Sequence, residues 1–572
     1  MRLLVLLSTL VSLSLYPFVG GSPVRRSTEP TVTLSYGGFQ GKTSGNLVKF
    51  LGMPFAAPPV GNLRFAPPQP PIPFAGVKPA TSFGAACFQQ LPQGIFADLI
   101  AQGVILNFTT TPTEGPAGLT INVVAPATLT PGQKVPVVFW MYGGGFQFGD
   151  ASVNPGDTLV ARSIEVGEPI IFVSANYRIN AFGFLGGKEV KEAGIGNAGL
   201  RDQRFAMQWI QENISLFGGD PTRVTIWGSS AGAISVGLHM VANNGDPQGL
   251  FHNAFMISGF PMALHDIEHQ QPFFDQLVKD TGCTGSTDPI ACLRAVPYDT
   301  LANAVNQSPG FFSFSSVQLS WPPTVDGQFI TQDPQTSIQQ GRYAKIPIIA
   351  GDCDDEGTVF SLTTLNITND SEFIDYMKTN YFEDIASAEQ LKAISIAYPQ
   401  DVTQGSPFNT GASNALTPQF KRLAAIQGDL EFQAPRRFFL ETASKTQPTY
   451  SYLYKRGKSV LLFGAQHGSD VNDWFGIGTS TDFVGTDAVE LTKLPVNFVN
   501  NGDPNTSNAP KGSNITHINW PLWSSDKENP PMFTFLDSPQ PGGSPTTTIT
   551  PDTYRTVGIQ QLIDIYLKIG TA

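Results

Sequence analysis

Four short, nearly continuous apolar runs constrain the fold of this chain more than any other feature of its sequence. They lie at residues 135–141, 170–175, 224–227 and 346–350. Strands that are apolar throughout are typical of parallel sheets, because helices cover both faces of such a sheet. Stretches with a helical pattern separate the runs, for example residues 200–213. The sequence therefore predicts an α/β fold with a large, mostly parallel central sheet, in which ligands bind beyond the carboxyl ends of the strands.

The overall composition argues against two broad classes of protein. Hydrophobic residues make up 41% of the chain and charged residues only 14%, which indicates a globular protein with a large core and not a disordered one. The formal net charge is −12, whereas a surface that binds nucleic acid would be basic. We therefore expect no nucleic-acid partner, and we interpret the acidic surface as a source of solubility.

The N-terminal residues have the pattern of a secretory signal peptide, which we place at 1–21. Arg2 supplies a positive charge, residues 3–15 are apolar, and small residues follow at 20–22. This apolar run is too short to span a membrane, and no later stretch is long enough. We expect a secreted, extracellular protein without a transmembrane segment.

A dibasic pair at 25–26 leaves two choices for the mature N-terminus. Cleavage there would release a short propeptide at 22–26 and make Ser27 the first residue in place of Ser22. From 27–572 we expect a single catalytic domain, since no internal repeat divides the chain.

Cysteines and glycosylation sequons agree with an extracellular location. Cys283 and Cys292 bracket a short loop rich in Gly, Ser, Thr and Pro, which a disulfide closes easily in an oxidising compartment. The sequence does not decide whether Cys87 and Cys353 pair with each other or stay free. Asn-x-Ser/Thr sequons, which predict a glycoprotein, are present at Asn107, Asn213, Asn306, Asn366, Asn369, Asn505 and Asn514.

The third apolar run ends in Gly228-x-Ser230-x-Gly232, the pattern of a nucleophile elbow. In this sharp strand-to-helix turn the neighbours of the serine must lack a bulky Cβ. The pattern alone is weak, but an apolar strand precedes it and an apolar helical pattern follows at 231–242. This context favours a nucleophilic Ser230 over a serine in an ordinary turn.

Acyl transfer also needs hydrogen-bond donors for the oxyanion. The glycines at 143–145 directly follow the first apolar run, where a backbone without side chains can direct N–H groups into a site. The N–H group of Ala231, next to the nucleophile, would be a further donor. The alternative is a flexible glycine turn.

The base follows by elimination, since in this fold class the order is Ser, acid, His. Only His467 and His517 leave ample room for an acid after Ser230. His467 lies in a Gly-bounded loop after a strand-like segment, whereas His517 lies beside a sequon. We therefore predict His467 as the base.

The acid should follow another buried strand. The apolar run at 346–350 leads into a segment with four acidic residues, Asp352, Asp354, Asp355 and Glu356. Residue types alone do not separate Asp355 from Glu356. A buried carboxylate would hold the histidine in the right tautomer and stabilise the imidazolium. We interpret the three remaining acids as an acidic surface loop.

One competing motif suggests zinc. His265 and His269 fit H-x-x-E-H, which places two ligands one helical turn apart. A zinc hydrolase also needs a third ligand, for which the sequence offers no evident candidate. We favour a polar helix face and expect no metal.

Several motifs together resemble the type-B carboxylesterase/lipase family, which includes cholinesterases and fungal lipases and sterol esterases. The resemblance runs from about residue 32 to the C-terminus, is closest to fungal extracellular lipases and sterol esterases, and implies the α/β-hydrolase fold. The motifs are Phe50-Leu51-Gly52-Met53-Pro54-Phe55-Ala56, Asn176-Tyr177-Arg178, Gly196-Asn197-Ala198-Gly199-Leu200, Phe217-Gly218-Gly219-Asp220-Pro221, Asp355-Glu356-Gly357-Thr358 and His467 with Asp470.

The resemblance implies roles for particular residues. It places the acid immediately before the glycine of the acidic segment, which selects Glu356. It implies that Gly144, Gly145 and Ala231 donate to the oxyanion, and that Ser258 supports the site from behind.

The sequence also departs from the family pattern at three positions. Ser229 stands where the family usually has Glu, and Tyr142 replaces the His common before the glycines. Gly118 stands where the family has a cysteine that pairs with the one matching Cys87. The disulfide at the base of the lid is therefore expected to be absent.

The family's lid corresponds to an insertion near 88–117. Here Ile95 and Leu99, and likewise Phe96 and Ile100, are spaced i,i+4 and form one apolar face. We predict a mobile flap that meets lipid or a bulky ester. The alternative is a short surface helix packed on the core.

Together these features predict a secreted serine ester hydrolase that acts through an acyl-enzyme on Ser230 without a cofactor. The expected substrates are small-molecule or lipid esters with apolar acyl or alcohol groups. One alternative is a feruloyl-type esterase for plant aromatic esters. Another is a non-catalytic, cholinesterase-like binding protein, which the presence of all three triad residues disfavours.

Overall fold

The computed structural model describes residues 29–90, 118–383, 385–477, 491–505, 519–539 and 546–569. The expected signal peptide, the expected propeptide and residues 91–117 of the expected lid lie outside the described residues. Among the helices that are described, none combines the length and the apolar character needed to cross a bilayer.

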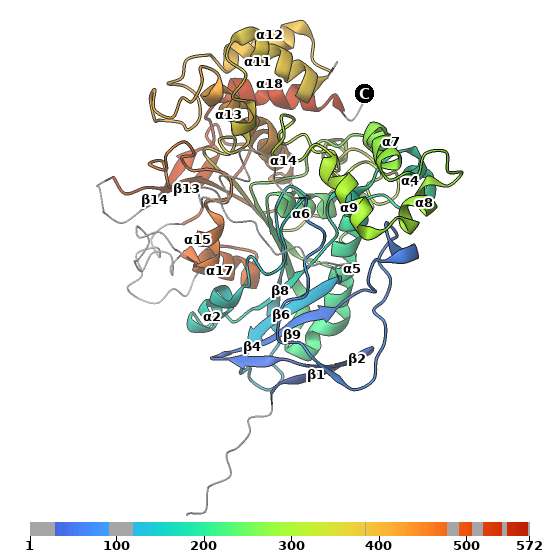
Figure 1. The fold of residues 1–572 in the computed structure, drawn as a ribbon. Helices are drawn as coiled ribbons and strands as arrows, with labels where there is room; N and C mark the ends of the chain where they lie inside the picture. Colours follow the sequence, from blue (N-terminus) through green and yellow to red (C-terminus); the bar gives the residue numbers. More distant parts are fainter. Residues whose placement is uncertain are drawn as a thin grey trace, which may run out of the picture.

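An eleven-stranded sheet within the described residues organises the fold (Figure 1). Its strand order is β14-β13-β12-β11-β10-β9-β7-β8-β6-β4-β3. Neighbours from β13 to β8 in this order run parallel, and the pairs at both edges are antiparallel. The bounds are β3 Lys42–Ser44, β4 Leu47–Pro54, β6 Thr120–Pro126, β7 Val135–Met141, β8 Ile171–Ala175, β9 Gly219–Ser229, β10 Asn253–Ile257, β11 Ile348–Cys353, β12 Thr449–Lys455, β13 Pro531–Leu536 and β14 Thr546–Pro551. A separate sheet contains β1 Thr31–Leu34, β2 Gly37–Gln40 and β5 Val77–Pro79.

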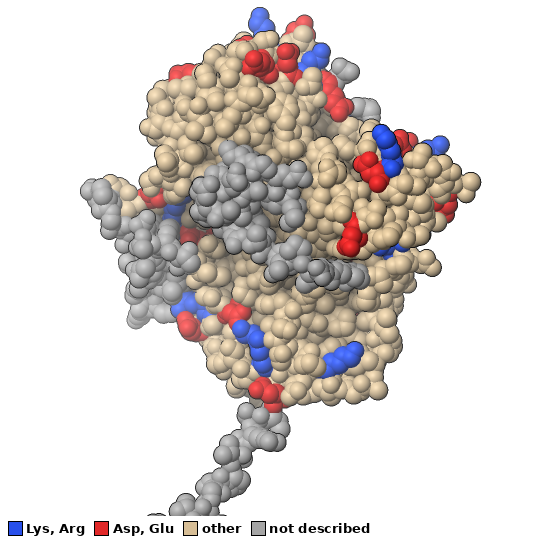
Figure 2. All heavy atoms as spheres, viewed as in Figure 1, with Lys and Arg blue, Asp and Glu red and all other residues tan. Residues whose placement is uncertain are grey.

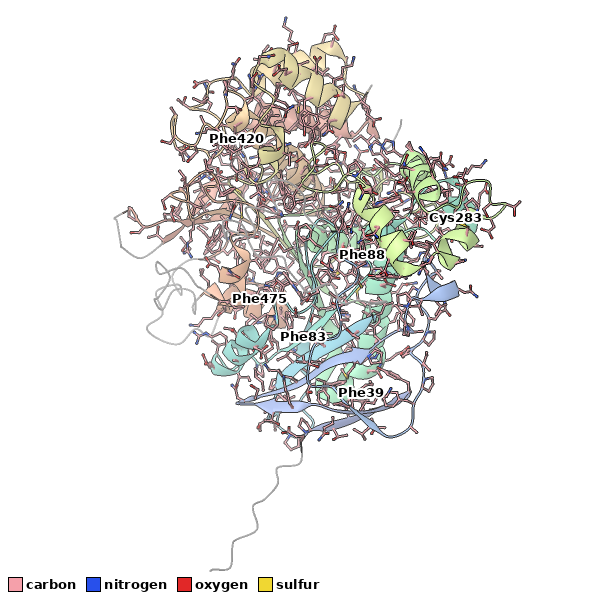
Figure 3. All side chains as sticks on the ribbon, viewed as in Figure 1. Phe39, Phe83, Phe88, Cys283, Phe420 and Phe475 are labelled. Carbon is pink, nitrogen blue, oxygen red and sulfur yellow. A yellow bond between two sulfur atoms is a disulfide. The ribbon has the colours of Figure 1, made fainter. Side chains whose placement is uncertain are left out.

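Alternating side chains of the central strands feed two hydrophobic cores, one on each face of the sheet. In β7, Val137 and Phe139 belong to the larger core, and Val138 and Trp140 belong to the other. The ring of Phe475, which is labelled in Figure 3, lies 4.8 Å from that of Trp140. Burial on both faces explains why this strand is apolar throughout, and it confirms the predicted mostly parallel α/β sheet.

Helices cover both faces of the sheet (Figure 1). Residues of α2, α15 and α17 contribute to the smaller core, and residues of α5, α6, α10, α14 and α18 contribute to the larger one. Their bounds are α2 Asp157–Glu165, α5 Ala198–Asn213, α6 Ala231–Val241, α10 Pro334–Gln339, α14 Ala434–Ala443, α15 Val471–Phe475, α17 Lys493–Asn501 and α18 Thr556–Tyr566. The other α-helices among the described residues are α3 Asn180–Phe184, α4 Lys188–Ala193, α7 Gln271–Asp280, α8 Pro289–Ala295, α9 Tyr298–Gln307, α11 Asp370–Tyr376, α12 Ala388–Ala397 and α13 Phe420–Gly428.

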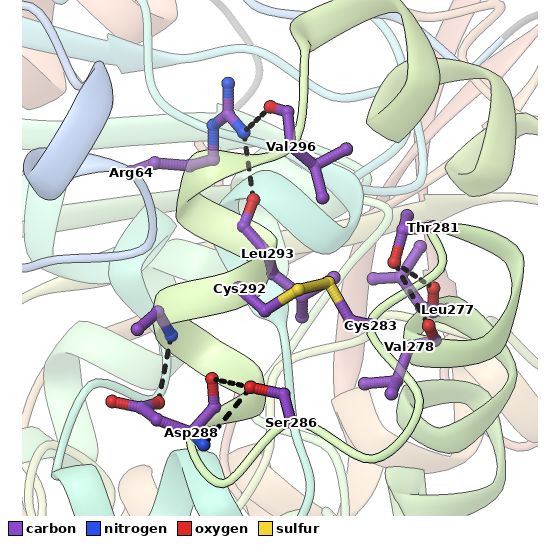
Figure 4. Close-up of a disulfide and its surroundings, with 11 residues drawn as sticks. Arg64, Leu277, Val278, Thr281, Cys283, Ser286, Asp288, Cys292, Leu293 and Val296 are labelled. Atoms are coloured by element: carbon purple, nitrogen blue, oxygen red, sulfur yellow. Dashed lines mark hydrogen bonds between the residues drawn. A yellow bond between two sulfur atoms is a disulfide. The ribbon is translucent and has the colours of Figure 1, made fainter.

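A disulfide joins Cys283, just after α7, to Cys292 within α8 (Figure 4), as the sequence predicts. Close to this loop, the Arg64 guanidinium donates hydrogen bonds to the carbonyl oxygens of Leu293 and Val296 at 2.9 and 2.7 Å. These bonds tie the disulfide-closed segment to the N-terminal part of the domain.

On the face shown in Figure 2, the described acidic and basic side chains are scattered and intermixed. A protein that follows a nucleic-acid backbone presents a clustered basic stripe instead. This face therefore offers no such stripe among its described residues.

Candidate active site

Ser230 lies at a sharp turn between β9 and α6. β9 ends at Ser229 and α6 begins at Ala231, while Ser230 itself has φ 55° and ψ −125°. This backbone conformation is strained for a residue with a side chain, and such strain clusters at functional sites. A hydrogen bond of 2.8 Å from Ser230 N to Ile257 O holds the turn against β10. The predicted strand, sharp turn and helix are confirmed here.

The glycines on either side of Ser230 are required by close packing. A Cβ at Gly232 would collide with the carbonyl oxygen of Met141 at the end of β7. A Cβ at Gly228 would collide with the backbone of Gly232. The Gly-x-Ser-x-Gly pattern thus reflects the tight approach of β7, β9 and α6.

The glycines after β7 lie beside this turn. A Cβ built on Gly143 would come within 3.0 Å of the Ser230 Cβ. Gly144 and Gly145 have φ values of 112° and 59°, which favour glycine. Within the described part of the chain, no carbonyl accepts from the N–H groups of Gly144 or Gly145, and the Ala231 N–H begins a helix and has no partner inside it. These three N–H groups can donate to a ligand oxygen.

Glu356 and His467 form the shortest contact of the site. His467 Nδ1 lies 2.5 Å from Glu356 Oε2. Glu356 Oε1 accepts from Ser258 Oγ at 2.7 Å and from Cys353 N at 2.6 Å. Because an ionised carboxylate can only accept, the hydrogen of the imidazole resides on Nδ1. This leaves Nε2 as the acceptor, and among the described residues Nε2 has no hydrogen-bond partner.

Two cavities meet at Ser230. One, of about 310 Å³, is also lined by His467, Gly144 and Gly145. The other, of about 280 Å³, is also lined by Gly145 and Ala231. The structure thus brings together the predicted serine, histidine and oxyanion donors, and each cavity can accept one side of an ester.

All four acidic residues of the segment 352–356 are buried, so the interpretation of three of them as an acidic surface loop is wrong. Asp352 and Asp355 are 0% exposed, Glu356 is 1% exposed and Asp354 is 3% exposed. Buried charges need partners, and the cations that supply them come from distant parts of the chain. No residue pattern in the sequence around β11 predicts those cations.

The three acids that do not contact His467 are paired with cations. Asp352 Oδ2 accepts from Arg436 Nε at 2.8 Å, and Lys458 Nζ lies 2.5 Å from both Asp354 Oδ2 and Asp355 Oδ2. Burial raises the pKa of Asp355, and the Lys458 ammonium partly offsets this. Burial also opposes ionisation of Asp354, but Lys458 and neighbouring cations outweigh it and hold its pKa below the ordinary range. Glu356 is the acid that geometry leaves for the histidine.

Asp355 instead binds the backbone of the loop that contains His467 and holds this loop in place. Its carboxylate accepts from Ala465 N at 2.8 Å and from Phe408 N at 2.8 Å. Its own N–H donates to Ala465 O at 3.0 Å. Because Ala465 lies two residues before His467, Asp355 positions the loop that carries His467.

Two aromatic rings that the sequence reasoning missed flank His467. The ring centroids of Phe360 and Phe432 lie 5.2 and 4.6 Å from the imidazole centroid. Phe432 belongs to η7 Asp429–Gln433, a π-helical segment between α13 and α14. Such segments are rare and leave no recognisable sequence pattern, although they recur at functional sites.

Two departures from the family pattern, Tyr142 and the missing cysteine partner of Cys87, have simple structural consequences. Tyr142 stacks on Tyr177 with a centroid distance of 4.3 Å, and its hydroxyl donates to Tyr177 O at 3.0 Å. Cys87 and Cys353 are both buried and free. Burial raises the pKa of both thiols. The expected absence of a disulfide from Cys87 is confirmed.

The zinc-like motif forms a different arrangement. The rings of His265 and His269 stack at 4.1 Å, and His269 Nε2 lies 3.7 Å from Glu383 Oε1. The acids of the motif, Asp266 and Glu268, pair with Lys191. In the described part of the chain, no three His, Cys, Asp or Glu side chains form a group that could hold a metal ion.

Comparisons with known proteins agree with this geometry. The chain matches the Carboxylesterase family over residues 28–546. Lipase 2 of Diutina rugosa is 39% identical over 540 residues, which cover 90% of this chain and 96% of that protein. Secreted lipase 1 of Botryotinia fuckeliana (strain B05.10) is 40% identical over 521 residues, which cover 87% and 88%.

Solved esterase structures share the fold. Aspergillus niger EstA has a TM-score of 0.77 and 25% identity, covering 95% of this chain and 99% of that one. The structure titled PNB esterase has a TM-score of 0.72 and 25% identity, covering 94% and 100%. These matches confirm the predicted α/β-hydrolase fold. The chain belongs to the carboxylesterase family and is a carboxylic ester hydrolase.

Proposed function

We propose that this chain is a secreted, lipase-like serine ester hydrolase that forms an acyl-enzyme on Ser230. The observation that carries the proposal is the arrangement around one cavity. Ser230 and the unpartnered Nε2 of His467 both line it, and Glu356 holds Nδ1 from behind. His265 and His269 also line a cavity at Ser230, but the carboxylate beside His269, that of Glu383, lies 3.7 Å from Nε2, which is too far for a hydrogen bond.

The proposed reaction has two steps. Nε2 of His467 takes the hydroxyl proton as Ser230 Oγ attacks the ester carbonyl, and Glu356 stabilises the imidazolium. The N–H groups of Gly144, Gly145 and Ala231 stabilise the oxyanion. The imidazolium then protonates the departing alcohol, and water, activated by the same imidazole, releases the acid and restores the serine.

Apolar esters are the proposed substrates. The cavities that share Ser230 are lined largely by apolar side chains, including Phe148 and Phe360 in one and Ile234 and Met262 in the other. The names of the fungal relatives, Lipase 2 and Secreted lipase 1, agree with this preference and with secretion. Contact of the 88–117 insertion with a lipid interface stays a prediction, because most of it lies outside the described residues.

Replacement of the nucleophile tests the proposal. Ser230→Ala should lower turnover of p-nitrophenyl esters by roughly 10⁶-fold, because the attacking oxygen is lost. Ser44→Ala, at an exposed position of the edge strand β3, is the control and should retain the activity. An alkyl chain-length series with a feruloyl ester alongside then measures the acyl preference. Retention of more than a few per cent of activity in folded Ser230→Ala would contradict the assignment.

A further inference from the structure

One buried carboxyl group in the Ser230 cavity is not used by the proposed mechanism. Glu431 lines the cavity of about 280 Å³ that also contains Ser230 and Ala231. Its exposed fraction is only 5%. Much of the surrounding wall is apolar, for example Met262 and Leu319. A carboxyl group in such a position needs a physical explanation, because Glu is almost never buried unless it is paired.

The backbone around Glu431 directs it toward the catalytic residues. Glu431 lies in the π-helical segment η7, directly before Phe432, whose ring packs on His467. Asp429 in the same segment contacts Arg555, and Gln433 donates to Cys353 O. Glu431 and Phe432 therefore occupy the side of η7 that lines the cavity, while their neighbours anchor the segment elsewhere.

The polar partners of Glu431 are few and weak. Its Oε1 accepts from Tyr566 OH at 3.2 Å and from Gln318 Nε2 at 3.4 Å, both longer than a good hydrogen bond. Among the described residues, Oε2 has no hydrogen-bond partner, and no Lys or Arg lines this cavity. A buried carboxyl group without a cation and with one unused oxygen is costly unless a ligand completes its hydrogen bonds.

We propose that Glu431 determines specificity by binding a hydroxyl group of the ester, so that among largely apolar esters the enzyme prefers those that carry one hydroxyl group to plain alkyl esters. This inference rests on the proposed function of Ser230. A hydroxyl group both donates and accepts, so it can pair with either form of a carboxyl group. An ammonium group would also pair with the carboxylate, but the apolar wall would penalise its desolvation.

The ionisation of Glu431 suits this task. Burial raises its pKa to about 7, and the hydrogen bond from Tyr566 partly offsets the increase. Near neutral pH both forms of the carboxyl group are therefore populated. The ionised form accepts from the substrate hydroxyl, and the protonated form donates to it.

The test compares matched esters that differ by one functional group. Straight-chain p-nitrophenyl esters are compared with the same chains bearing a terminal hydroxyl or a terminal amine, over a series of lengths. A second set of measurements compares acetates of alkanols with monoacetates of the matching diols. It shows whether the enzyme recognises a hydroxyl group on the acyl side or on the alcohol side of the ester. The measured quantity is the ratio of kcat/KM for the hydroxylated ester to that for the plain ester.

We expect this ratio to favour the hydroxyl at one chain length and to fall about tenfold or more in Glu431→Leu, because a hydrogen bond to a buried carboxyl group is lost. Glu431→Gln, which keeps the shape and one acceptor, should restore part of the ratio. Glu528→Gln, on the exposed surface, is the control and should leave the ratio unchanged. Thermal melting of each variant verifies that it is folded.

The possible results are distinguishable. An unchanged ratio in folded Glu431→Leu and Glu431→Gln would overturn the inference, even though hydrolysis still required Ser230. A stronger preference for the amine-bearing ester, or no hydroxyl preference at any length in either set of measurements, would overturn it as well. Hydrolysis that survives in Ser230→Ala would instead refute the proposed function on which the inference depends.

Discussion

Glu356→Gln should reduce catalysis strongly while leaving most of the stability of the fold intact. The wild-type carboxylate accepts from Ser258 and Cys353 on Oε1 and from His467 on Oε2. The amide oxygen of Gln can keep the first two donors. Its NH₂ group then faces Nδ1 and donates to it, so the imidazole hydrogen moves to Nε2. In that tautomer His467 cannot accept the proton of Ser230.

The expected loss of kcat follows from this wrong tautomer of His467. Replacing the acid of a serine triad by its amide lowers kcat roughly 10⁴-fold, which corresponds to about 5 kcal/mol of transition-state stabilisation. The cost in folding should be smaller, about 1–2 kcal/mol, because only one buried hydrogen bond is replaced by another and the volume is unchanged. Activity should therefore collapse in a protein that still unfolds cooperatively at a similar temperature.

Asp355→Asn is the matched comparison and should show the reverse. Asp355 contacts Lys458 and the backbone of the histidine loop but not His467. Weakening this buried pair should lower the free energy of unfolding by about 3 kcal/mol. Because Glu356 still holds the imidazole, the folded fraction should keep kcat within about tenfold.

The assay combines kcat for p-nitrophenyl butyrate with urea unfolding for both variants. Two results would refute the reasoning. One is a folded Glu356→Gln enzyme with kcat within tenfold of wild type. The other is a larger loss of kcat in well-folded Asp355→Asn, which would move the catalytic acid by one residue.

Two further predictions concern the buried charges and the cysteines. Burial opposes ionisation of Asp354 and Asp355, and Lys458 offsets it, so Lys458→Met should raise the pKa of both carboxyl groups. The loss of unfolding free energy in Lys458→Met should be largest at neutral pH, where ionisation of both carboxyl groups is favoured in the unfolded chain, and should shrink in mild acid, where both groups are protonated. Urea unfolding at the two pH values measures this difference. An equal loss of stability at both pH values would contradict the prediction. Alkylation of the native protein should leave Cys283 and Cys292 unmodified, and non-reducing peptide mapping should find them linked; a free thiol at either position would contradict the disulfide.

The parts of the site that the sequence predicts are those with local causes. At Ser230, the strand, the turn and the helix are consecutive, and the flanking glycines are needed because Gly228 and Gly232 pack against nearby backbone. His467 follows from chain order and from the Gly-bounded loop around it. These features depend on neighbouring residues, so a short pattern contains enough information to find them.

The acid and the cavity wall depend on contacts between distant segments, and residue patterns could not reveal them. Asp355 meets Lys458 across 103 positions of sequence, and Asp352 meets Arg436 across 84. Because neither cation lies near the acidic segment in the sequence, the segment has the residue pattern of an exposed loop. Glu431 is similarly hidden, because a π-helical segment places it in the cavity and no pattern of apolar residues marks that turn.

The buried cations also explain how four neighbouring acids can coexist with a histidine that acts as the base in the proposed mechanism. If the other three carboxylates were unpaired, they would compete with Glu356 for the imidazolium. Instead Arg436 pairs with Asp352 and Lys458 pairs with Asp354 and Asp355, and none of these residues lines either cavity at Ser230. Glu356 differs from the other three acids because no Lys or Arg pairs with it. Apart from His467, its hydrogen-bond donors are the neutral groups Ser258 Oγ and Cys353 N. In the proposed mechanism, the positive charge that develops on the imidazole during attack is therefore stabilised by Glu356.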